Sequence, residues 1–463
     1  MTVWTLGRKS AEREPFFEGV PTGATSDTGK VIVIGAGASG LTAARILQDQ
    51  GRDVIVLEGR ERLGGRLHTI QVGGGMVDEG GNWIHGVPEN PLYHLAQDSG
   101  FTISEDNFIH PFRMKVFDQV TGRNVNPFKM LYFLWQAARV IGRYTHESLT
   151  ATHTESNLAD RLEKDIARVR GANNKRYFRF LLRMVIDLTA AQNSELLHPN
   201  GMALNPDYED GKDYVIEGGY SRLIERLAAR LDVRLRTIVE AINYADDGVE
   251  IVTNQGIFQG SHVIVTVPLG VLKTKAITFN PPLPTWKLEA IGNMGMGVVE
   301  KIALKFETPF WRSSTQTPRS VFYVANELGD FPAFIDTTSS AGQPMLIAFL
   351  SGEQVRRMGQ DAEPFVERAA EVLKEIFPNS YQEPTAVHVT NWAQDPFSLG
   401  SYSTPAVGVS AEDYDQLAKP IAGRVLFAGE ATYRERAGFV EGAIGSGIRE
   451  ARRILGREVD LVL

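Results

Sequence analysis

The chain has 463 residues, of which 43% are apolar and 22% are charged, and its formal net charge is −8. This length exceeds one ordinary domain of about 100–200 residues, and the composition argues against extended disorder. The acidic balance argues against nucleic acid as a partner, and the absence of cysteine excludes disulfides, thiolate metal sites and a thioether link to a cofactor.

Residues 1–29 are predicted to form an irregular arm, because Pro15, Pro21 and several glycines interrupt any regular pattern. They lack the apolar core of a signal peptide, and no run of about 18 apolar residues occurs anywhere in the chain. We therefore expect a cytoplasmic protein that does not enter a membrane.

Residues 30–57 are typical of a βαβ unit, with a strand, a glycine turn, a helix and a second strand. In such a unit the first glycine permits a tight turn, the second lets a pyrophosphate approach the backbone, and the third lets helix and strand pack closely. The helix N-terminus offers free N–H groups to the anion, and Glu58 can accept a hydrogen bond from a ribose hydroxyl. The predicted dinucleotide-binding residues are Gly35, Gly37, Ser39, Gly40 and Glu58.

The elements that follow change in character several times. Helical spacing between about residues 127 and 197 predicts a helical insertion, and residues 213–267 return to a helix and strands. Prolines at 281, 282 and 284 precede four strands, in VVEKIALKF, VFYV, MLIAFL and AVHVTNW, around a helix near residues 365–377. The chain closes with a strand in RVLFAGE and a helix in GFVEGAIGSGIREARRIL.

A second glycine turn, residues 62–66 with the sequence RLGGR, follows the βαβ unit. It resembles the second FAD fingerprint of the flavin-containing amine oxidases, a family that includes polyamine oxidases, monoamine oxidases and lysine-specific histone demethylases. The resemblance implies that backbone and arginine meet the pyrophosphate and ribityl region of FAD, whereas a solvated basic loop is the alternative. The residues implied are Arg60, Gly64, Gly65 and Arg66.

Residues 80–86, GGNWIHG, resemble the tryptophan-containing loop that runs beneath the flavin in polyamine oxidases. The resemblance implies that His85 lies near the substrate amine, although a histidine in a loop is often only hydrogen bonded there. The residues assigned to the FAD site with this loop are Gly81, Asn82, Trp83, Ile84 and, from a later strand, Val239.

Residues 263–311 are similar to the corresponding region of polyamine oxidases and lysine-specific histone demethylases, and the similarity places Lys301 at the family's active-site lysine. That lysine holds a water near flavin N5 and is associated with reoxidation by oxygen. Periodicity alone puts Lys301 on one face with Val299 and Ala303, which would also fit a solvated strand lysine.

Three C-terminal segments complete the resemblance: residues 391–402, FAGE at 427–430 and GFVEGA at 438–443. The resemblance implies that Trp392 packs against the flavin and that Tyr402 and Phe439 form an aromatic slot for the amine, with packing in the core as the alternative. Ser401 stands where some monoamine oxidases carry a cysteine bonded to the flavin, so we expect non-covalent FAD. The remaining residues assigned to FAD are Gly429, Glu430, Gly438, Phe439 and Val440.

Glycines at 442, 445 and 447 weaken the last predicted helix, by up to about 1 kcal/mol each relative to alanine. They therefore indicate close approach either to the flavin or to a neighbouring helix.

The predicted fold is an α/β (α+β) two-domain architecture. Residues 30–112, 212–280 and 395–458 are expected to form a Rossmann-like FAD-binding domain. It would be interleaved with a substrate domain at residues 113–211 and 281–394, made of a mixed sheet and the helical insertion.

The implied function is FAD-dependent amine oxidation, with hydride transfer from the α-carbon of a primary or secondary amine to flavin N5. Imine hydrolysis and reoxidation by O₂ to hydrogen peroxide would follow. We expect a monomer or homodimer, with no metal and no nucleic acid. Polyamines are preferred over monoamines because the acidic cluster Asp207, Glu209 and Asp210 could hold a distal ammonium, with a solvated acidic turn as the alternative.

Other functions are available to this architecture. An L-amino-acid oxidase would need a cation for the substrate carboxylate, for which Arg113, Arg179 and Arg183 are candidates. A desaturase or oxidase of an apolar substrate, and a flavin-binding scaffold or chromatin partner without turnover, are the remaining alternatives.

Overall fold

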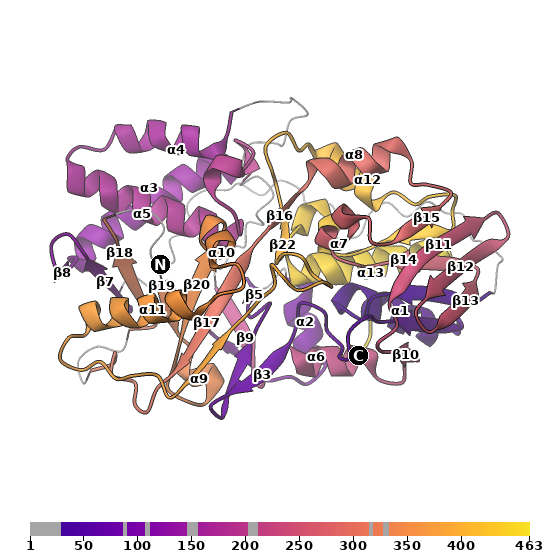
Figure 1. Cartoon of the computed structure of the whole chain (residues 1–463), viewed down its shortest axis with the longest axis horizontal. Helices are drawn as coiled ribbons and strands as arrows, with labels where there is room; N and C mark the ends of the chain where they lie inside the picture. The colour runs from indigo at the N-terminus through magenta and orange to yellow at the C-terminus, as the bar shows by residue number, and fades with distance from the viewer. Residues whose placement is uncertain are drawn as a thin grey trace.

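The computed structural model describes residues 29–86, 90–106, 112–145, 156–201, 212–313, 318–326 and 333–463. The predicted arm, apart from Gly29, and the acidic cluster Asp207, Glu209 and Asp210 lie outside these residues. Figure 1 shows an elongated molecule with two lobes, each built on its own large sheet.

The first lobe is built on a five-stranded parallel sheet. Its strand order is β10-β2-β1-β14-β23. The apolar runs of β1 and β2 are wholly buried, because both faces of a parallel sheet are covered. The strands are β1 Val31–Ile34, β2 Val54–Leu57, β10 Val233–Arg234, β14 His262–Val265 and β23 Val425–Phe427.

The two faces of this sheet have different covers. Val31 and Val33 of β1 pack into a core with the helices, while Ile32 and Ile34 pack into a second core under a smaller four-stranded sheet. This alternation follows from the two-residue period of a strand. The helices are α1 Ala38–Asp49, α6 Ser221–Ala228 and α13 Val440–Leu455; the covering strands are β11 Val239–Ala245, β12 Gly248–Thr253, β13 Gly256–Gly260 and β15 Thr278–Asn280.

The second lobe is built on a mixed seven-stranded sheet of order β21-β17-β20-β19-β18-β7-β8. Its neighbouring strands are antiparallel except for β18 and β7, which pair in parallel. The strands are β7 Met114–Asp118, β8 Arg123–Asn124, β17 Val299–Lys305, β18 Ser320–Val324, β19 Ala333–Asp336, β20 Met345–Ser351 and β21 Ala386–Val389.

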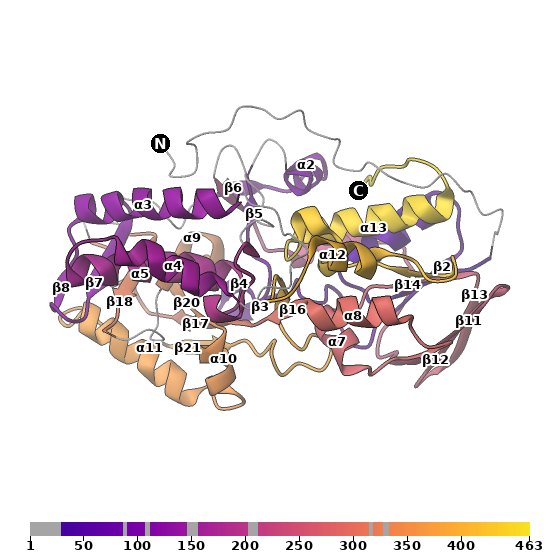
Figure 2. The same ribbon diagram turned by 90° about the horizontal axis from the view of Figure 1, so that it is seen from above.

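Helices cover both faces of the seven-stranded sheet. Figure 2 shows α3, α4 and α5 on one side and α10 and α11 on the other. Apolar residues of the sheet accordingly divide between two cores, one with the α3–α5 helices and one with α10 and α11. The helices are α3 Pro127–Thr145, α4 Leu158–Ala167, α5 Ala172–Thr189, α10 Glu353–Met358 and α11 Glu363–Ile376.

Short elements occupy the region between the lobes and the surrounding surface. Three small sheets pair β3 with β4, β5 and β6 with β9, and β16 with β22. Their strands are β3 Thr69–Val72, β4 Gly75–Asp78, β5 Ile84–His85, β6 Ile103–Glu105, β9 Asp213–Ile216, β16 Gly295–Gly297 and β22 Tyr402–Thr404. The other helices are α2 Pro91–Asp98, η1 Ser194–Leu196, α7 Leu269–Thr274, α8 Thr285–Asn293, α9 Thr338–Ala341, α12 Ala411–Ala418, η3 Glu430–Thr432 and η4 Arg434–Arg436.

The chain passes between the lobes more than once, which confirms the predicted interleaved architecture. The parallel sheet takes strands from both ends of the chain, and the mixed sheet takes β7 and β8 from before the helical insertion and the rest from residues 299–389. Within the described residues, no helix combines the length and apolarity needed to cross a bilayer.

Candidate functional site

The two predicted glycine turns lie side by side. Gly37 and Gly64 form an isolated parallel β-bridge, and the Gly64 N–H donates to the Ala36 carbonyl oxygen at 2.8 Å. Gly35 has a φ of +107°, and a Cβ on Gly40 would stand 2.0 Å from the Gly35 oxygen. Only glycine fits these two positions, because other residues rarely adopt that φ and any side chain would collide.

The backbone at Gly37 and Gly429 is uncrowded, which leaves space for a group such as a pyrophosphate to approach it. A Cβ on Gly37 would have no neighbour closer than 3.9 Å, and one on Gly429 none closer than 4.0 Å. Helix α1 begins directly after Gly37, so its free N–H groups and the positive end of its dipole face this space. The hydroxyl of Ser39 pairs with that of Ser446 on α13 at 3.0 Å, which leaves the Ser39 backbone as the group available to an anion. The residues present therefore fit a dinucleotide.

Glu58 is buried beneath the first glycine turn. One carboxylate oxygen accepts from the Ala36 N–H at 2.7 Å and the other from the Arg60 N–H at 2.8 Å. The Thr237 N–H donates to the Glu58 carbonyl oxygen at 2.8 Å, which brings Val239 and β11 beside the end of β2. Each carboxylate oxygen keeps a second lone pair for a ribose hydroxyl.

The two predicted arginines contact segments far along the chain. The guanidinium of Arg60 binds Asp395 at 2.5 Å and Ser398 at 2.9 Å. Arg66 donates from Nη1 to the Ser401 carbonyl oxygen at 2.9 Å and to Glu430 at 2.8 Å. Both side chains therefore join the second glycine turn to the C-terminal segments of the site. A Cβ added to Gly65 would stand 3.5 Å from the Gly37 Cα, so the two glycine turns lie close together.

Glu430 is buried at the centre of the C-terminal segments. Besides Arg66, its carboxylate accepts from the Ser403 hydroxyl at 2.6 Å and from the Gly438 N–H at 2.9 Å. The carboxylate thus fixes β22 and the entry to α13 relative to each other. The neighbouring Gly429 is the uncrowded member of this pair, where a cofactor could approach the backbone. Glu430 instead binds protein groups.

Lys301 lies in the interior between the lobes, and the solvated-strand alternative is wrong. Its side chain is 5% exposed, and Nζ donates to the carbonyl oxygens of Asp78 at 2.8 Å and Gly80 at 2.7 Å. Burial lowers the pKa of Lys301 to about 8, and the nearby carboxylates of Asp78 and Glu79 partly oppose that effect. The cation is therefore held at neutral pH but releases its proton more easily than a surface lysine.

The loop predicted to run beneath the flavin lies against this lysine through Gly80 and Trp83. Trp83 lies with its ring 5.9 Å from the Lys301 Nζ and donates from Nε1 to Asp106 at 3.3 Å. Gly81 donates its N–H to the Arg66 carbonyl oxygen at 3.3 Å, which joins the loop to the second glycine turn. Ile84 is fully buried in the core of the first lobe.

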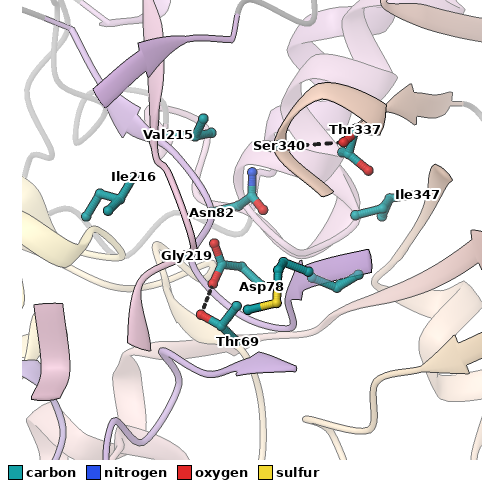
Figure 3. Close-up of a pocket in the computed structure, with 11 residues that line it drawn as sticks. Thr69, Asp78, Asn82, Val215, Ile216, Gly219, Thr337, Ser340 and Ile347 are labelled. Carbon is teal, nitrogen blue, oxygen red and sulfur yellow. Dashed lines mark hydrogen bonds between the residues drawn. The ribbon is translucent and has the colours of Figure 1, made fainter. Parts of the chain in front are cut away.

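Asn82 of this loop lines a small pocket beside Asp78. Figure 3 shows Asn82 facing this pocket with Thr337 and Ser340 of the second lobe, and Thr69 bonded to Asp78. This placement puts the Asn82 side chain between residues of the first lobe, such as Thr69, and residues of the second lobe, such as Thr337.

The side chains of Trp392 and Lys301 bind the same short backbone segment, residues 78–80. The Trp392 Nε1–H donates to the Glu79 carbonyl oxygen at 3.1 Å, while Lys301 binds the carbonyl oxygens on either side. Three consecutive carbonyl groups thus accept hydrogen bonds from Lys301 and Trp392, the two side chains that the sequence analysis expects near the flavin.

His85 sits at the N-terminus of α13. Its Nδ1 lies 2.6 Å from an Asp213 carboxylate oxygen, and its ring meets that of Phe439 edge-on with centroids 5.6 Å apart. Burial opposes a charge on His85, but Asp213 and Glu441 outweigh it and raise the pKa of His85 above its ordinary value. His85 is therefore a group that can carry a proton near neutral pH.

Tyr402 and Phe439 are both half-buried rather than sealed in a core. The Tyr402 hydroxyl donates to the Leu188 carbonyl oxygen at 2.8 Å, and Gly438 packs against the tyrosine ring. Phe439 precedes Val440, the first residue of α13, whose side chain lies beside Gly81. Both aromatic residues therefore border the site formed by the loop and α13.

The helix glycines of α13 contact protein. A Cβ on Gly447 would stand 2.4 Å from the Ser39 carbonyl oxygen, so α1 and α13 approach closely there. Gly442 packs against the Arg436 backbone and Gly445 against the Tyr433 ring. Gly447 therefore matches the predicted close approach to a neighbouring helix, whereas Gly442 and Gly445 pack against the segment that precedes α13.

Several residues of the site carried no sequence signal. Asp213 contacts His85 although the two residues are 128 positions apart in the sequence. His68 and His388 lie on either side of Glu79, near Lys301. Asp78 and Gly80 bind Lys301 through backbone carbonyls, so their residue types do not indicate the contact. The three arginines considered as binders of a substrate carboxylate in an amino-acid oxidase have other surroundings. Arg179 binds Glu163, Arg183 binds Asp187 and Glu195, and Arg113 is exposed.

Comparisons with known proteins agree with this geometry. A sequence profile described as flavin containing amine oxidoreductase matches residues 38–455. The Arabidopsis thaliana protein named lysine-specific histone demethylase 1 homolog 2 is 35% identical over 440 residues, spanning 92% of this chain and 58% of that protein. In Oryza sativa subsp. japonica, lysine-specific histone demethylase 1 homolog 3 is 33% identical over 454 residues, spanning 92% of this chain and 54% of that protein.

The chain thus spans about half the length of the curated relatives it matches. Among solved structures, wild-type putrescine oxidase bound to putrescine superposes with a TM-score of 0.76 at 21% identity, covering 92% of this chain and 99% of the other. At that identity the likeness establishes a shared fold.

Proposed function

Because the chain belongs to the family of flavin-containing amine oxidoreductases and its cofactor is FAD, we propose that it is an amine oxidase that uses molecular oxygen as the electron acceptor. The observation that carries this proposal is the buried ammonium of Lys301, held by the carbonyls of Asp78 and Gly80 next to the second glycine turn. A buried cation there stabilises negative charge as oxygen is reduced.

The cofactor would be held without a covalent bond by the two glycine turns, by Glu58 and by Arg66, with the N-terminus of α1 at the pyrophosphate. When bound, FAD supplies an acceptor for the hydride of the amine α-carbon, after which water hydrolyses the imine. Lys301 would hold a water molecule and a positive charge at the reacting face.

The substrate amine would lie between Tyr402 and Phe439, close to His85. Two rings on either side of the nitrogen orient the α-carbon and exclude water from it. His85, hydrogen bonded to Asp213, would hold or release a proton beside the amine as pH changes. We favour a polyamine or a monoamine as the substrate.

A second candidate substrate is an N-methylated lysine side chain. The relatives at 35% and 33% identity are named for lysine-specific histone demethylation, which is a higher identity than the 21% shared with putrescine oxidase. Oxidation of the N-methyl carbon of such a lysine is the same reaction on a secondary or tertiary amine.

Anaerobic reduction of the bound flavin tests these assignments directly. The purified protein would be mixed without oxygen with putrescine, spermidine, a long-chain monoamine, an N-methyl-lysine peptide, an L-amino acid and an apolar alkene. Bleaching of the flavin absorbance by one of the amines, followed by oxygen uptake and peroxide formation on aeration, is expected. Bleaching only by the amino acid or the alkene, or slow recovery in air, would reject the oxidase proposal.

A further inference from the structure

The backbone of residues 78–80 connects several parts of the site. Its three carbonyls accept, in order, from Lys301, Trp392 and again Lys301. The segment follows β4 and continues into the loop that carries Trp83 and His85. A shift of this backbone would move the Lys301 ammonium and the Trp392 ring together.

The side chain in the middle of this segment is fastened from both lobes. One carboxylate oxygen of Glu79 lies 2.5 Å from His68 Nδ1, and the other lies 2.7 Å from His388 Nε2. His68 lies two residues after the second glycine turn, and His388 lies in β21 of the mixed sheet, beside β17, the strand of Lys301. The Glu79 side chain is 16% exposed and the two histidines 28% and 32%, so the cluster is close enough to solvent to exchange protons.

The cluster is not arranged as a metal site. Among the described residues, no three histidine, aspartate, glutamate or cysteine side chains converge as ligands of one ion would. The two histidines instead approach different oxygens of one carboxylate, which is the geometry of a doubly hydrogen-bonded anion.

We propose that Glu79, clamped between His68 and His388, is a positioning residue that holds Lys301 in place and in its ammonium form. The inference rests on the role assigned to Lys301 under the proposed function. The clamp fixes the two carbonyls that bind Nζ, and its carboxylate adds negative charge beside the cation.

The charges around Glu79 explain how the clamp responds to pH. Besides the two histidines, the charged groups that interact with it are Arg62 of the second glycine turn and Lys301 and Glu300 of β17, and its neighbour Asp78 acts with it on Lys301. Burial opposes the ionisation of Glu79, but the hydrogen bonds from His388 and His68 outweigh it and lower the pKa of Glu79 to about 2. The carboxylate therefore stays charged at neutral pH, and removing it would lower the pKa of Lys301.

Stopped-flow reoxidation of the reduced holoenzyme by oxygen, measured from pH 6 to 10, tests the proposal. Glu79→Leu is expected to slow reoxidation by about tenfold, less than the roughly 10²–10³-fold lost with a group that contacts the reacting atoms, because Glu79 acts through Lys301. Glu79→Gln, which keeps the shape but not the charge, should move the alkaline fall in rate to lower pH by roughly half a unit to one unit.

Variants of the two histidines separate the effect of hydrogen bonding to Glu79 from the effect of its charge. His68→Asn and His388→Gln put an amide N–H where Nδ1 and Nε2 stand, so they should retain the rate near pH 8, whereas His68→Leu and His388→Leu should not. A purely structural clamp would lower thermal stability in the leucine variants without moving the pH profile of the folded enzyme. That result would overturn the proposal.

The Lys301→Met variant distinguishes the two possible failures. If its reoxidation is as fast as that of the wild type, the role of Lys301 itself is wrong. If Lys301→Met is slow but the Glu79 variants keep the wild-type rate and pH profile, the proposed function stands and the clamp is rejected.

Discussion

Ser401 and Val299 hold each other through two hydrogen bonds. The Ser401 hydroxyl donates to the Val299 carbonyl oxygen at 2.9 Å and accepts from the Val299 N–H at 2.8 Å. This pair fastens the segment before Tyr402 to β17, two residues from Lys301. Ser401, which by resemblance corresponds to a flavin-bound cysteine of some monoamine oxidases, thus connects two parts of the candidate site.

Non-covalent binding of FAD is the first prediction that follows. Acid or heat precipitation should release intact FAD into the supernatant, because the Ser401 hydroxyl is no thioether donor and the sequence contains no cysteine. The measurement is the flavin absorbance and fluorescence of supernatant and pellet. A pellet that stays yellow after washing in denaturant would contradict non-covalent binding.

Replacement of Lys301 should impair the reaction with oxygen. Because burial lowers the pKa of Lys301 to about 8, its ammonium is present below that pH and is lost above it, so reoxidation should slow as pH rises through about 8. Lys301→Met should reoxidise at least about tenfold more slowly and lose this pH dependence, while its affinity for FAD changes little.

Lys305 provides the matched control for this experiment. It lies on the same strand four residues further on but is partly exposed, so Lys305→Met should reoxidise at the wild-type rate. Equal slowing in both variants would assign the effect to strand stability rather than to the buried cation.

The pH dependence of flavin reduction should depend on Asp213. Burial disfavours the charged form of His85, but Asp213 overcomes this and raises the pKa of His85. A protonated His85 repels the substrate ammonium, so kcat/KM should fall on the acid side as His85 gains a proton. Asp213→Asn lowers the pKa of His85 and should move this acid limb to lower pH, whereas Asp247→Asn at an exposed turn should not. Superimposable profiles for Asp213→Asn and the wild type would show that His85 does not face the substrate.

The aromatic slot predicts a separation between rate and stability. Tyr402→Ala and Phe439→Ala should slow anaerobic flavin reduction, with small changes in melting temperature, because both rings are only half-buried. Tyr402→Phe removes only the hydroxyl that binds Leu188, so it is the control for the ring itself. Core aromatics would instead cost about 3–5 kcal/mol of stability on truncation. Early unfolding with a normal reduction rate in the alanine variants would therefore exclude the slot.

Local patterns were sufficient for much of the fold. The buried β-branched runs at residues 31–34 and 54–57, separated by a glycine turn and a helix, predicted the βαβ unit correctly. The change to helical spacing near residue 127 likewise predicted the helices that cover the mixed sheet. The β3–β4 hairpin and the β16–β22 pair escaped prediction, since their strands (TIQV, GMVD, GMG and YST) contain no run of β-branched apolar residues like those of β1 and β2.

The sequence by itself determined the βαβ unit, the succession of helical and strand regions and the family, because these depend on residues close together along the chain. Only the tertiary structure decided that Lys301 is buried, because its contacts with Asp78 and Gly80 span 223 and 221 positions and run through backbone carbonyls. The same holds for Glu79, whose partner His388 lies 309 positions away. Strand periodicity tells which side chains share a face, but whether that face meets water or another lobe depends on how the whole chain packs.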